Sequence, residues 1–286
     1  MGNWYLFSII ALILMGTQRF LYKVAAERNC PAAWTTFSFM ATVTILSFIF
    51  LLVLKESVSS WKMLGLIALW NSGAFVLGTV THIEALKHLP SSIVYPVIRL
   101  NMVLVILFSI LYFNDSLSPY QWSGMMIAAV VMVILAREAE HKKEAYGDRK
   151  KGLILVFVSL LFGSMASISS KFAALYTNKL GFMALSYFMG SLFSLVLTKE
   201  FKSQKRAKNL KEAVVIGTMM GVVNFAGFYA FLKALSQGPL SLVVSITGMH
   251  FVIAVVLSVV LYKEKLTVTR ILGVALTVVS VLFLRS

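Results

Sequence analysis

The sequence repeats itself in ALKHLPSSIVYPVIRLNMVLVILFSILYFNDSLSPYQWSGMMIAAVVMVIL (85–135) and ALSQGPLSLVVSITGMHFVIAVVLSVVLYKEKLTVTRILGVALTVVSVLFL (234–284), two segments that align without a gap at a spacing of 149 residues. The residues they share include Pro90 and Pro239, Ser109 and Ser258, and Gly124 and Gly273. If each copy holds an odd number of membrane spans, the second copy must enter the bilayer upside down relative to the first. The repeat therefore predicts an inverted two-fold architecture.

The composition predicts that the chain lies in a membrane. With 59% apolar and 13% charged residues, it has too little polar surface for a water-soluble domain. Stretches poor in charge recur that are long enough to cross about 30 Å of hydrocarbon at about 1.5 Å per residue. Ten can be read: 3–22, 31–54, 63–86, 91–113, 118–136, 152–172, 180–198, 212–233, 240–262 and 268–284. Because backbone groups in lipid need internal partners, we expect an all-α integral membrane protein with ten transmembrane helices as two inverted five-helix repeats.

This count divides the chain into three parts. We expect the first repeat over residues 1–137, a charged linker over 138–151 and the second, inverted repeat over 152–286. The single cysteine, Cys30, excludes an internal disulfide and a thiol pair for metal or redox chemistry, so no metal or cofactor is expected.

The positive charge predicts an orientation. Lysines and arginines gather after the fifth, seventh and ninth spans, and the positive-inside rule places these loops in the cytoplasm. We therefore expect a multi-pass protein of the cytoplasmic membrane with both termini extracytoplasmic. The basic loops suit anionic lipid headgroups. A net charge of +15 also raises the possibility of nucleic-acid binding, but no loop is long enough for a folded basic module.

Two pairs of motifs suggest a family. FNDSLSPYQWSG (113–124) and YKEKLTVTRILG (262–273) share an acidic residue, a short turn, a helix start and a glycine; Gly16 with Lys23 and Gly163 with Lys171 form a second pair. With these motifs the chain resembles the drug/metabolite transporter superfamily in its ten-helix EamA-type form, over nearly its whole length. The resemblance implies a transporter. The chain departs from the family at TFSFM (36–40), where an arginine-phenylalanine pair is common, and in orientation, since family members are usually described with cytoplasmic termini.

Two acidic residues precede the last span of each repeat. Asp115 and Glu264 stand just before the fifth and tenth spans, where the positive end of a helix dipole favours an acid by about 0.3–1 kcal/mol. We expect both to cap these helices; a direct substrate or proton role is the alternative.

Polar residues within the spans mark the candidate substrate site, because each one is costly in lipid unless it faces the bundle interior. Arg99 follows Pro96 in the fourth span and either lines a cavity or reaches back to the interface. Asn101 and His250 are repeat-related, so a pseudo-two-fold axis would bring them near the midplane. His250 is either a proton-coupling group or a neutral, hydrogen-bonded histidine.

Further candidates share a polar or aromatic side chain inside a span. They are Gln18, Arg19, Asn71, Asn224, Tyr229, Tyr95 and Ser167. Hydroxyls and amides in such positions also join helices to each other, and aromatic residues also pack in cores or at interfaces. Lys23 and Lys171 lie near span ends, so we expect them to extend toward the interface.

These residues favour one class of function. The first span holds Gln18 and Arg19 where small superfamily members that export cationic drugs carry a glutamate, which disfavours a lipophilic cation. Span arginines favour an amino acid or another organic solute with a negative group. We predict a secondary transporter working by alternating access, in the export direction, as a monomer coupled to H⁺ or Na⁺; an exchanger of phosphorylated or nucleotide-linked solutes is the alternative. No HExxH, phosphate loop or nucleophile elbow supports an enzyme, and no continuous polar stripe supports a channel.

Overall fold

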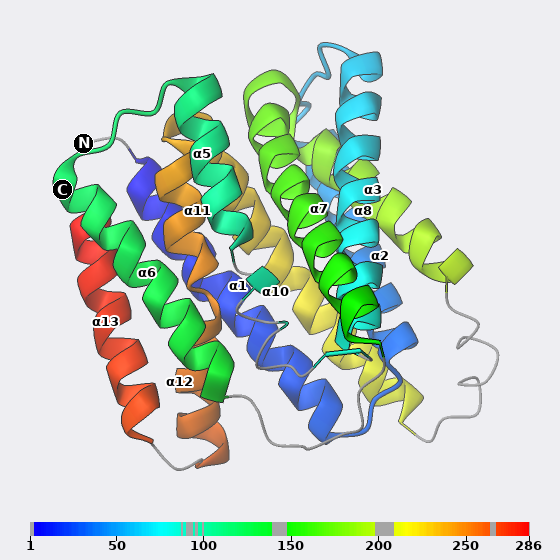
Figure 1. Cartoon of the computed structure of the whole chain (residues 1–286). Coiled ribbons are helices and arrows are strands. Elements are labelled where there is room, and N and C mark those ends of the chain that lie inside the picture. The colour runs from blue at the N-terminus through cyan, green and yellow to red at the C-terminus, as the bar shows by residue number, and fades with distance from the viewer. Residues whose placement is uncertain are drawn as a thin grey trace.

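The structure is a computed structural model that describes residues 3–86, 88–89, 94, 97–98, 100–138, 148–197, 209–263 and 267–285. Regular structure in these ranges is helical throughout (Figure 1). The helices are α1 (Trp4–Glu27), α2 (Ala32–Val53), α3 (Trp61–Leu86), α5 (Asn101–Phe113), α6 (Pro119–Glu138), α7 (Arg149–Tyr176), α8 (Lys179–Leu197), α10 (Leu210–Gln237), α11 (Leu240–Gly248), α12 (Phe251–Tyr262) and α13 (Val268–Arg285). Each of the ten expected spans overlaps at least one of them, which confirms the all-helical fold.

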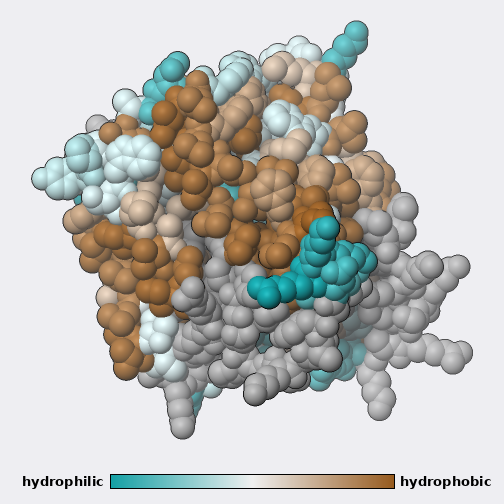
Figure 2. All heavy atoms as spheres, in the orientation of Figure 1, coloured by the Kyte–Doolittle hydropathy of each residue, from teal (hydrophilic) through white to brown (hydrophobic). Residues whose placement is uncertain are grey.

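The exterior of the bundle is apolar. Six helical stretches in the described ranges are long and apolar enough to cross a membrane, and the α11–α12 pair counts as one of them. Large hydrophobic side chains such as Leu6, Phe48 and Leu111 are more than half exposed. Figure 2 shows hydrophobic residues covering much of one face of the molecule. Such a surface suits hydrocarbon and not water, so the chain is an integral, multi-pass membrane protein.

The fourth span of each repeat departs from the continuous helix that we expected. In the second repeat α11 ends at Gly248 and α12 begins at Phe251. The amides of Met249 and Val252 donate to carbonyls three residues earlier, at 3.2 and 3.0 Å, so the helix tightens here instead of continuing as an α-helix. The amides of Leu100 and Val103, which lie 149 residues earlier, make the same bonds at 3.0 and 2.9 Å. A glycine at 248 favours the interruption, because glycine is a poor helix former.

The two repeats are interleaved. α1, the first helix of repeat one, packs against α10, α11 and α12 of repeat two, and α7 packs in the same way against α3 and α5 of repeat one. α2 contacts α8, and α6 contacts α13, so second spans pair with each other and fifth spans do likewise. α5 and α12 also end alike, at Asn114 and Lys263, which both adopt the left-handed conformation. The sequence repeat is therefore a spatial pseudo-symmetry.

The bundle has two distinguishable ends. Trp4 of α1 contacts Gly238 after α10, and the Arg285 guanidinium lies 5.9 Å from the Tyr5 ring centre, so these residues share one end, which we name the terminal face. Figure 1 shows both chain ends there, close together. The opposite end, the basic-loop face, holds Arg28 after α1 and Asn209 before α10.

The start of α7 differs from our expectation. Asp148 accepts hydrogen bonds from the amides of Lys150 and Lys151 at 2.9 and 3.3 Å, so α7 begins at Arg149, inside the segment 138–151 that we assigned to the linker. Residues 139–147 of that segment lie outside the described ranges. The division at residues 137 and 152 stays a prediction.

The expected role of Asp115 needs a correction. Ser118 caps α6, because its Oγ accepts from the Gln121 amide at 3.2 Å while Gln121 Oε1 accepts from the Ser118 amide at 3.0 Å. Asp115 Oδ2 accepts instead from Ser241, at 2.8 Å from Oγ and 3.3 Å from the amide, at the start of α11. The carboxylate therefore caps a helix of the other repeat. Its repeat equivalent, Glu264, lies outside the described residues.

Candidate functional site

The centre of the candidate site is a contact between α1 and the break of the second repeat. A Cβ atom on Gly16 would lie 2.4 Å from the His250 carbonyl oxygen, so only a glycine lets α1 approach the break this closely. One turn further along α1, Arg19 Nε donates to His250 Nε2 at 3.1 Å. The absence of a side chain at one position thus brings a guanidinium and an imidazole together at the other.

Hydrogen bonds define the state of His250. Because Nε2 accepts from Arg19, Nδ1 carries the proton and donates to the Thr247 carbonyl at 2.7 Å. Both ring nitrogens are occupied, and a second positive charge beside Arg19 would be unfavourable. This geometry matches the neutral, hydrogen-bonded form of the two alternatives that the sequence left open for His250. The imidazole is 7% exposed, whereas the Arg19 side chain that it holds is exposed.

The other face of α1 takes part in a second set of bonds, the polar chain of Tyr187, Asn224, Gln18 and Tyr22. Tyr187 donates its hydroxyl to Asn224 Oδ1 at 2.6 Å, and Asn224 Nδ2 donates to Gln18 Oε1 at 2.8 Å. Gln18 Nε2 lies 3.5 Å from the Tyr22 hydroxyl, a long contact. The polar chain joins α8 and α10 to α1, and the Arg19 guanidinium lies 5.7 Å from the Tyr22 ring centre.

Aromatic rings surround the polar chain. Tyr22 and Tyr187 each make an edge contact with Phe39 of α2, with ring centres 6.4 and 5.8 Å apart, and Tyr187 makes another with Phe228, at 5.7 Å. Amide and hydroxyl groups are thus set in an apolar lining, the usual composition of a site for a small organic ligand.

Three further candidates from the sequence make contacts away from this centre. Asn71 donates to the Ala166 carbonyl at 2.9 Å and accepts from Ser186 at 3.0 Å, which binds α3 to α7 and α8. Ser167 donates to the Gly163 carbonyl of its own helix at 3.3 Å. Tyr229 lies under the Lys233 ammonium, at 5.5 Å. These contacts suit helix packing, and a ligand role for the three residues stays a prediction.

The remaining candidates are the fourth-span residues of repeat one. Asn101 lies at the start of α5, where its carbonyl accepts from Ser164 of α7 at 3.3 Å and its side chain lies beside Gly163. Asn101 thus lies beside Gly163 of α7, the first helix of repeat two, as His250 lies beside Gly16 of α1, the first helix of repeat one. Arg99 and Tyr95 lie outside the described residues, so their place in the site stays a prediction.

Sequence reasoning missed Tyr22 and considered Tyr187 only as an aromatic residue that could stack on a ligand, without linking it to the polar candidates. Tyr22 and Tyr187 are ordinary aromatic residues in apolar spans, although the four-residue spacing of Gln18 and Tyr22 does predict that they share a helix face. Lys171 was wrongly expected to extend to the interface: it is 7% exposed and donates to the carbonyls of Leu235 and Gly238 at 2.6 and 2.8 Å.

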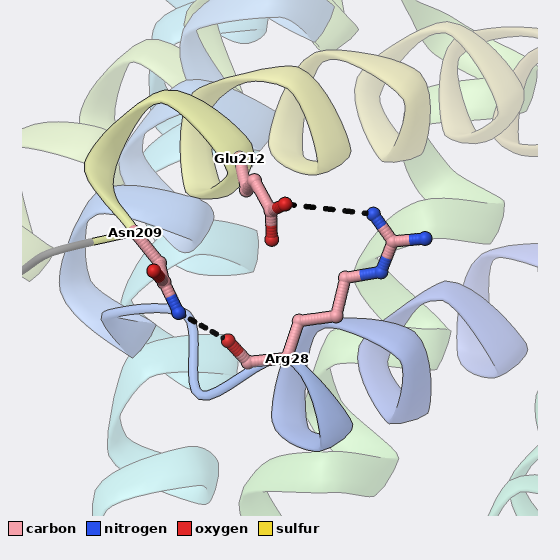
Figure 3. Close-up of polar contacts among 3 residues, drawn as sticks. All are labelled: Arg28, Asn209 and Glu212. Carbon is pink, nitrogen blue, oxygen red and sulfur yellow. Dashed lines mark hydrogen bonds and ion pairs between the residues drawn. The ribbon is translucent and has the colours of Figure 1, made fainter.

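Charges around the site are unbalanced. Within the described residues no carboxylate pairs with Arg19, and its two Nη groups donate to no described residue. An acid–base contact lies just beyond the C-terminal end of α1, where Glu212 is 3.9 Å from Arg28 and Asn209 donates to the Arg28 carbonyl at 2.7 Å (Figure 3). Arg28 and Glu212 are both about half exposed, so this pair contributes little to stability. Among the described residues, Arg19 thus carries a positive charge that no carboxylate balances.

Other site types find no support in this geometry. The described ranges hold no group of three or more histidine, cysteine, aspartate or glutamate residues that could bind a metal ion. Cys30 lies between α1 and α2, where burial and the nearby Glu212 raise the pKa of its thiol, so it is a weak nucleophile.

Comparisons with known proteins agree with the architecture. No curated protein matches the sequence significantly. A solved structure described as "Crystal structure of protein" superimposes with a TM-score of 0.76 at 17% identity, covering 98% of this chain and 96% of that one, which shows a shared fold. The model of the EamA-like transporter family matches twice, over residues 2–137 and 150–286, once for each repeat. The chain therefore belongs to the EamA-like transporter family, whose members are membrane transporters of the drug/metabolite superfamily.

Proposed function

We propose that the protein is a secondary transporter that moves a small organic solute bearing a negative group, such as an amino acid or an organic acid, across the cytoplasmic membrane. The observation that carries the proposal is the exposed Arg19 guanidinium, which is held by buried His250 and has no carboxylate partner among the described residues. An unbalanced charge on a membrane-spanning helix is costly unless a group of opposite charge neutralises it.

The geometry of Arg19 suits a carboxylate. Its Nε is used by His250, which leaves the edge formed by the two Nη groups for a ligand. Two parallel N–H donors match the two oxygens of one carboxylate, and such paired, charge-assisted bonds are among the strongest in proteins. His250 prevents the guanidinium from turning, so the free edge keeps one direction. The rings of Tyr22 and Tyr187 supply an apolar surface for the carbon part of the solute.

The break between α11 and α12 supports alternating access. Interrupted helices beside a central site are a recurrent feature of secondary transporters with inverted repeats, because the two half-helices can change their angle while the site stays in place. In this scheme α1 follows the break through the Arg19–His250 bond, while α10 stays attached to α1 through Asn224 and Gln18. Export, a proton or sodium gradient as driving force, and a monomeric state complete the proposal.

The test is ligand-induced thermal stabilisation of the purified protein. Carboxylates, amino acids, phosphorylated metabolites and organic cations are screened against the unchanged protein, Arg19→Ala and the control Arg28→Ala, which removes an exposed arginine at the end of the same helix. We expect carboxylated solutes to raise the melting temperature of the unchanged protein and of Arg28→Ala but not of Arg19→Ala.

Three outcomes decide the proposal. Stabilisation by organic cations alone refutes the proposal that the solute carries a negative group. An equal response of Arg19→Ala removes Arg19 from the site, and repeating the screen with Arg99→Ala then tests the other span arginine. A response confined to phosphorylated solutes favours the exchanger alternative.

A further inference from the structure

Lys171 is a buried cation with no place in the substrate site. It lies near the end of α7 at the terminal face and is 7% exposed. Its ammonium donates to the carbonyls of Leu235 and Gly238, at the end of α10, and lies 5.4 Å from the Phe113 ring centre at the end of α5. Burial of a charge in the membrane is costly, and here two charge-assisted hydrogen bonds to the end of α10 and a cation–π contact with the end of α5 offset that cost.

Asp115 adds bonds between the two repeats at the same place. Its carboxylate accepts from Ser109 of α5 and from Ser241 at the start of α11, and Asp115 itself lies two residues beyond Phe113, whose ring Lys171 contacts. The Ser241 amide also lies 3.2 Å from Ser109 Oγ. Ser109 and Ser241 are fully buried. We name Lys171, Asp115, Ser109 and Ser241 the terminal latch.

The repeat places a related lysine at the other face. Lys23, near the basic-loop end of α1, lies 5.2 Å from the Tyr262 ring centre, and Tyr262 is the repeat equivalent of Phe113. Lys171 of α7 therefore contacts the last aromatic residue of α5, in repeat one. Lys23 of α1 contacts the last aromatic residue of α12, in repeat two. The two differ in burial, since Lys171 is buried and Lys23 is partly exposed.

We propose that the terminal latch is the gate that closes the terminal face of the transporter, and that the pair of Lys23 and Tyr262 is the corresponding element at the basic-loop face. This inference rests on the proposed alternating-access function. Any movement of one repeat against the other at the terminal face must break the bonds from Asp115 to Ser241, because these residues belong to different repeats. On this proposal, the structure with these bonds intact represents the state in which the terminal face is closed.

The experiment measures access from the terminal face without using a substrate. Cys30 is the single cysteine, so Cys30→Ser gives a cysteine-free chain, and Ser245→Cys then adds a reporter. Ser245 is fully buried and lies one turn beyond Ser241 on α11, with its hydroxyl bonded to the Ser241 carbonyl at 2.7 Å. An impermeant maleimide is applied to intact cells and to inside-out vesicles, and a tag on the C-terminus identifies which preparation exposes the terminal face.

We expect Lys171→Gln, which removes the cation that lies over Phe113 of repeat one, to raise the labelling rate from the terminal face at least about tenfold, the factor expected for the loss of a buried cation–π contact. Labelling from the basic-loop face should not rise. The matched control is Lys233→Gln, which removes a partly buried lysine of the neighbouring helix without breaking a latch bond. If Lys171→Gln does not accumulate, Asp115→Asn carries the same expectation.

Unchanged labelling in Lys171→Gln overturns the gate, and so does an equal rise in Lys233→Gln, which would indicate general loosening. Because the readout needs no solute, the gate can fail while carboxylate binding at Arg19 stands. Carboxylate binding can equally fail in the thermal screen while the gate stands.

Discussion

Replacing Gly16 by alanine tests the contact on which the candidate site depends. The added Cβ would lie 2.4 Å from the His250 carbonyl oxygen and 2.4 Å from Ile253 Cβ, about 1 Å short of the 3.4 Å at which ordinary contact begins. Both neighbours are part of the α12 scaffold and not the ends of flexible side chains. α1 must therefore move outward by roughly 1 Å, which lengthens the 3.1 Å bond between Arg19 and His250 to about 4 Å, beyond hydrogen-bond range.

Overpacking of this kind costs about 1–3 kcal/mol, which lowers the melting temperature of a chain of this size by roughly 3 to 10 °C. Two glycines provide a graded comparison. At Gly163, the corresponding position of α7, the nearest atom is the Asn101 side-chain nitrogen at 3.0 Å, which can move aside, so alanine should cost less. At Gly73 nothing lies within 4 Å, so alanine should stabilise α3 by up to about 1 kcal/mol.

The assay is thermal unfolding of the three purified variants, followed by the carboxylate screen. We expect the order of stability Gly73→Ala, Gly163→Ala, Gly16→Ala, and only Gly16→Ala should lose its ligand response. A Gly16→Ala protein that melts with Gly73→Ala and keeps that response would falsify the close approach of α1 to the break.

Three further expectations follow from the same contacts. Asn224→Ala leaves Gln18 Oε1 and the Tyr187 hydroxyl without their Asn224 partner, which should cost about 1–3 kcal/mol per buried group, measured by thermal unfolding; wild-type stability would contradict the polar chain. Asn71→Ala should also lower the melting temperature but keep the carboxylate response, and loss of that response would make Asn71 a ligand. Since Glu212 helps to raise the pKa of the Cys30 thiol, Glu212→Gln should lower it, increase the thiolate fraction at pH 8 and speed alkylation; slower alkylation would contradict this sign.

The sequence was sufficient for the architecture because it records the repeat directly. Pro90 with Pro239 and Gly124 with Gly273 fix the alignment, and the charge-poor stretches give the number of spans. The breaks in the fourth spans were not predicted, because polar residues such as Asn101 and His250 do not by themselves interrupt a helix, although Gly248 marks the position. α7 begins earlier than expected because Asp148 caps it. Asp148 was not recognised as a helix cap because it lies in a segment with many other charged residues, which we assigned to the linker.

Several residues of the site could be predicted from the sequence, but the hydrogen bonds that join them across helices could not. Arg19 and His250 were recognisable as polar residues in apolar spans, yet they are 231 residues apart in the chain, and a single sequence does not show which helices meet. The prediction for Lys171 was wrong because it rested on the position of the residue near a span end, where a lysine usually reaches water. Here the carbonyls at the end of α10 replace water as acceptors.

The interleaving of the repeats also governs the order of synthesis. α1 enters the membrane first, but Asn224 and His250, the partners of its Gln18 and Arg19, are made only after about three quarters of the chain. Until then two polar side chains of α1 lack their native hydrogen bonds, and Gly16 lacks its contacts with His250 and Ile253. The nascent first half is therefore an incomplete molecule that depends on temporary partners, and a chain truncated after the first repeat should be recognised as unfinished and degraded, even though its five spans are all present.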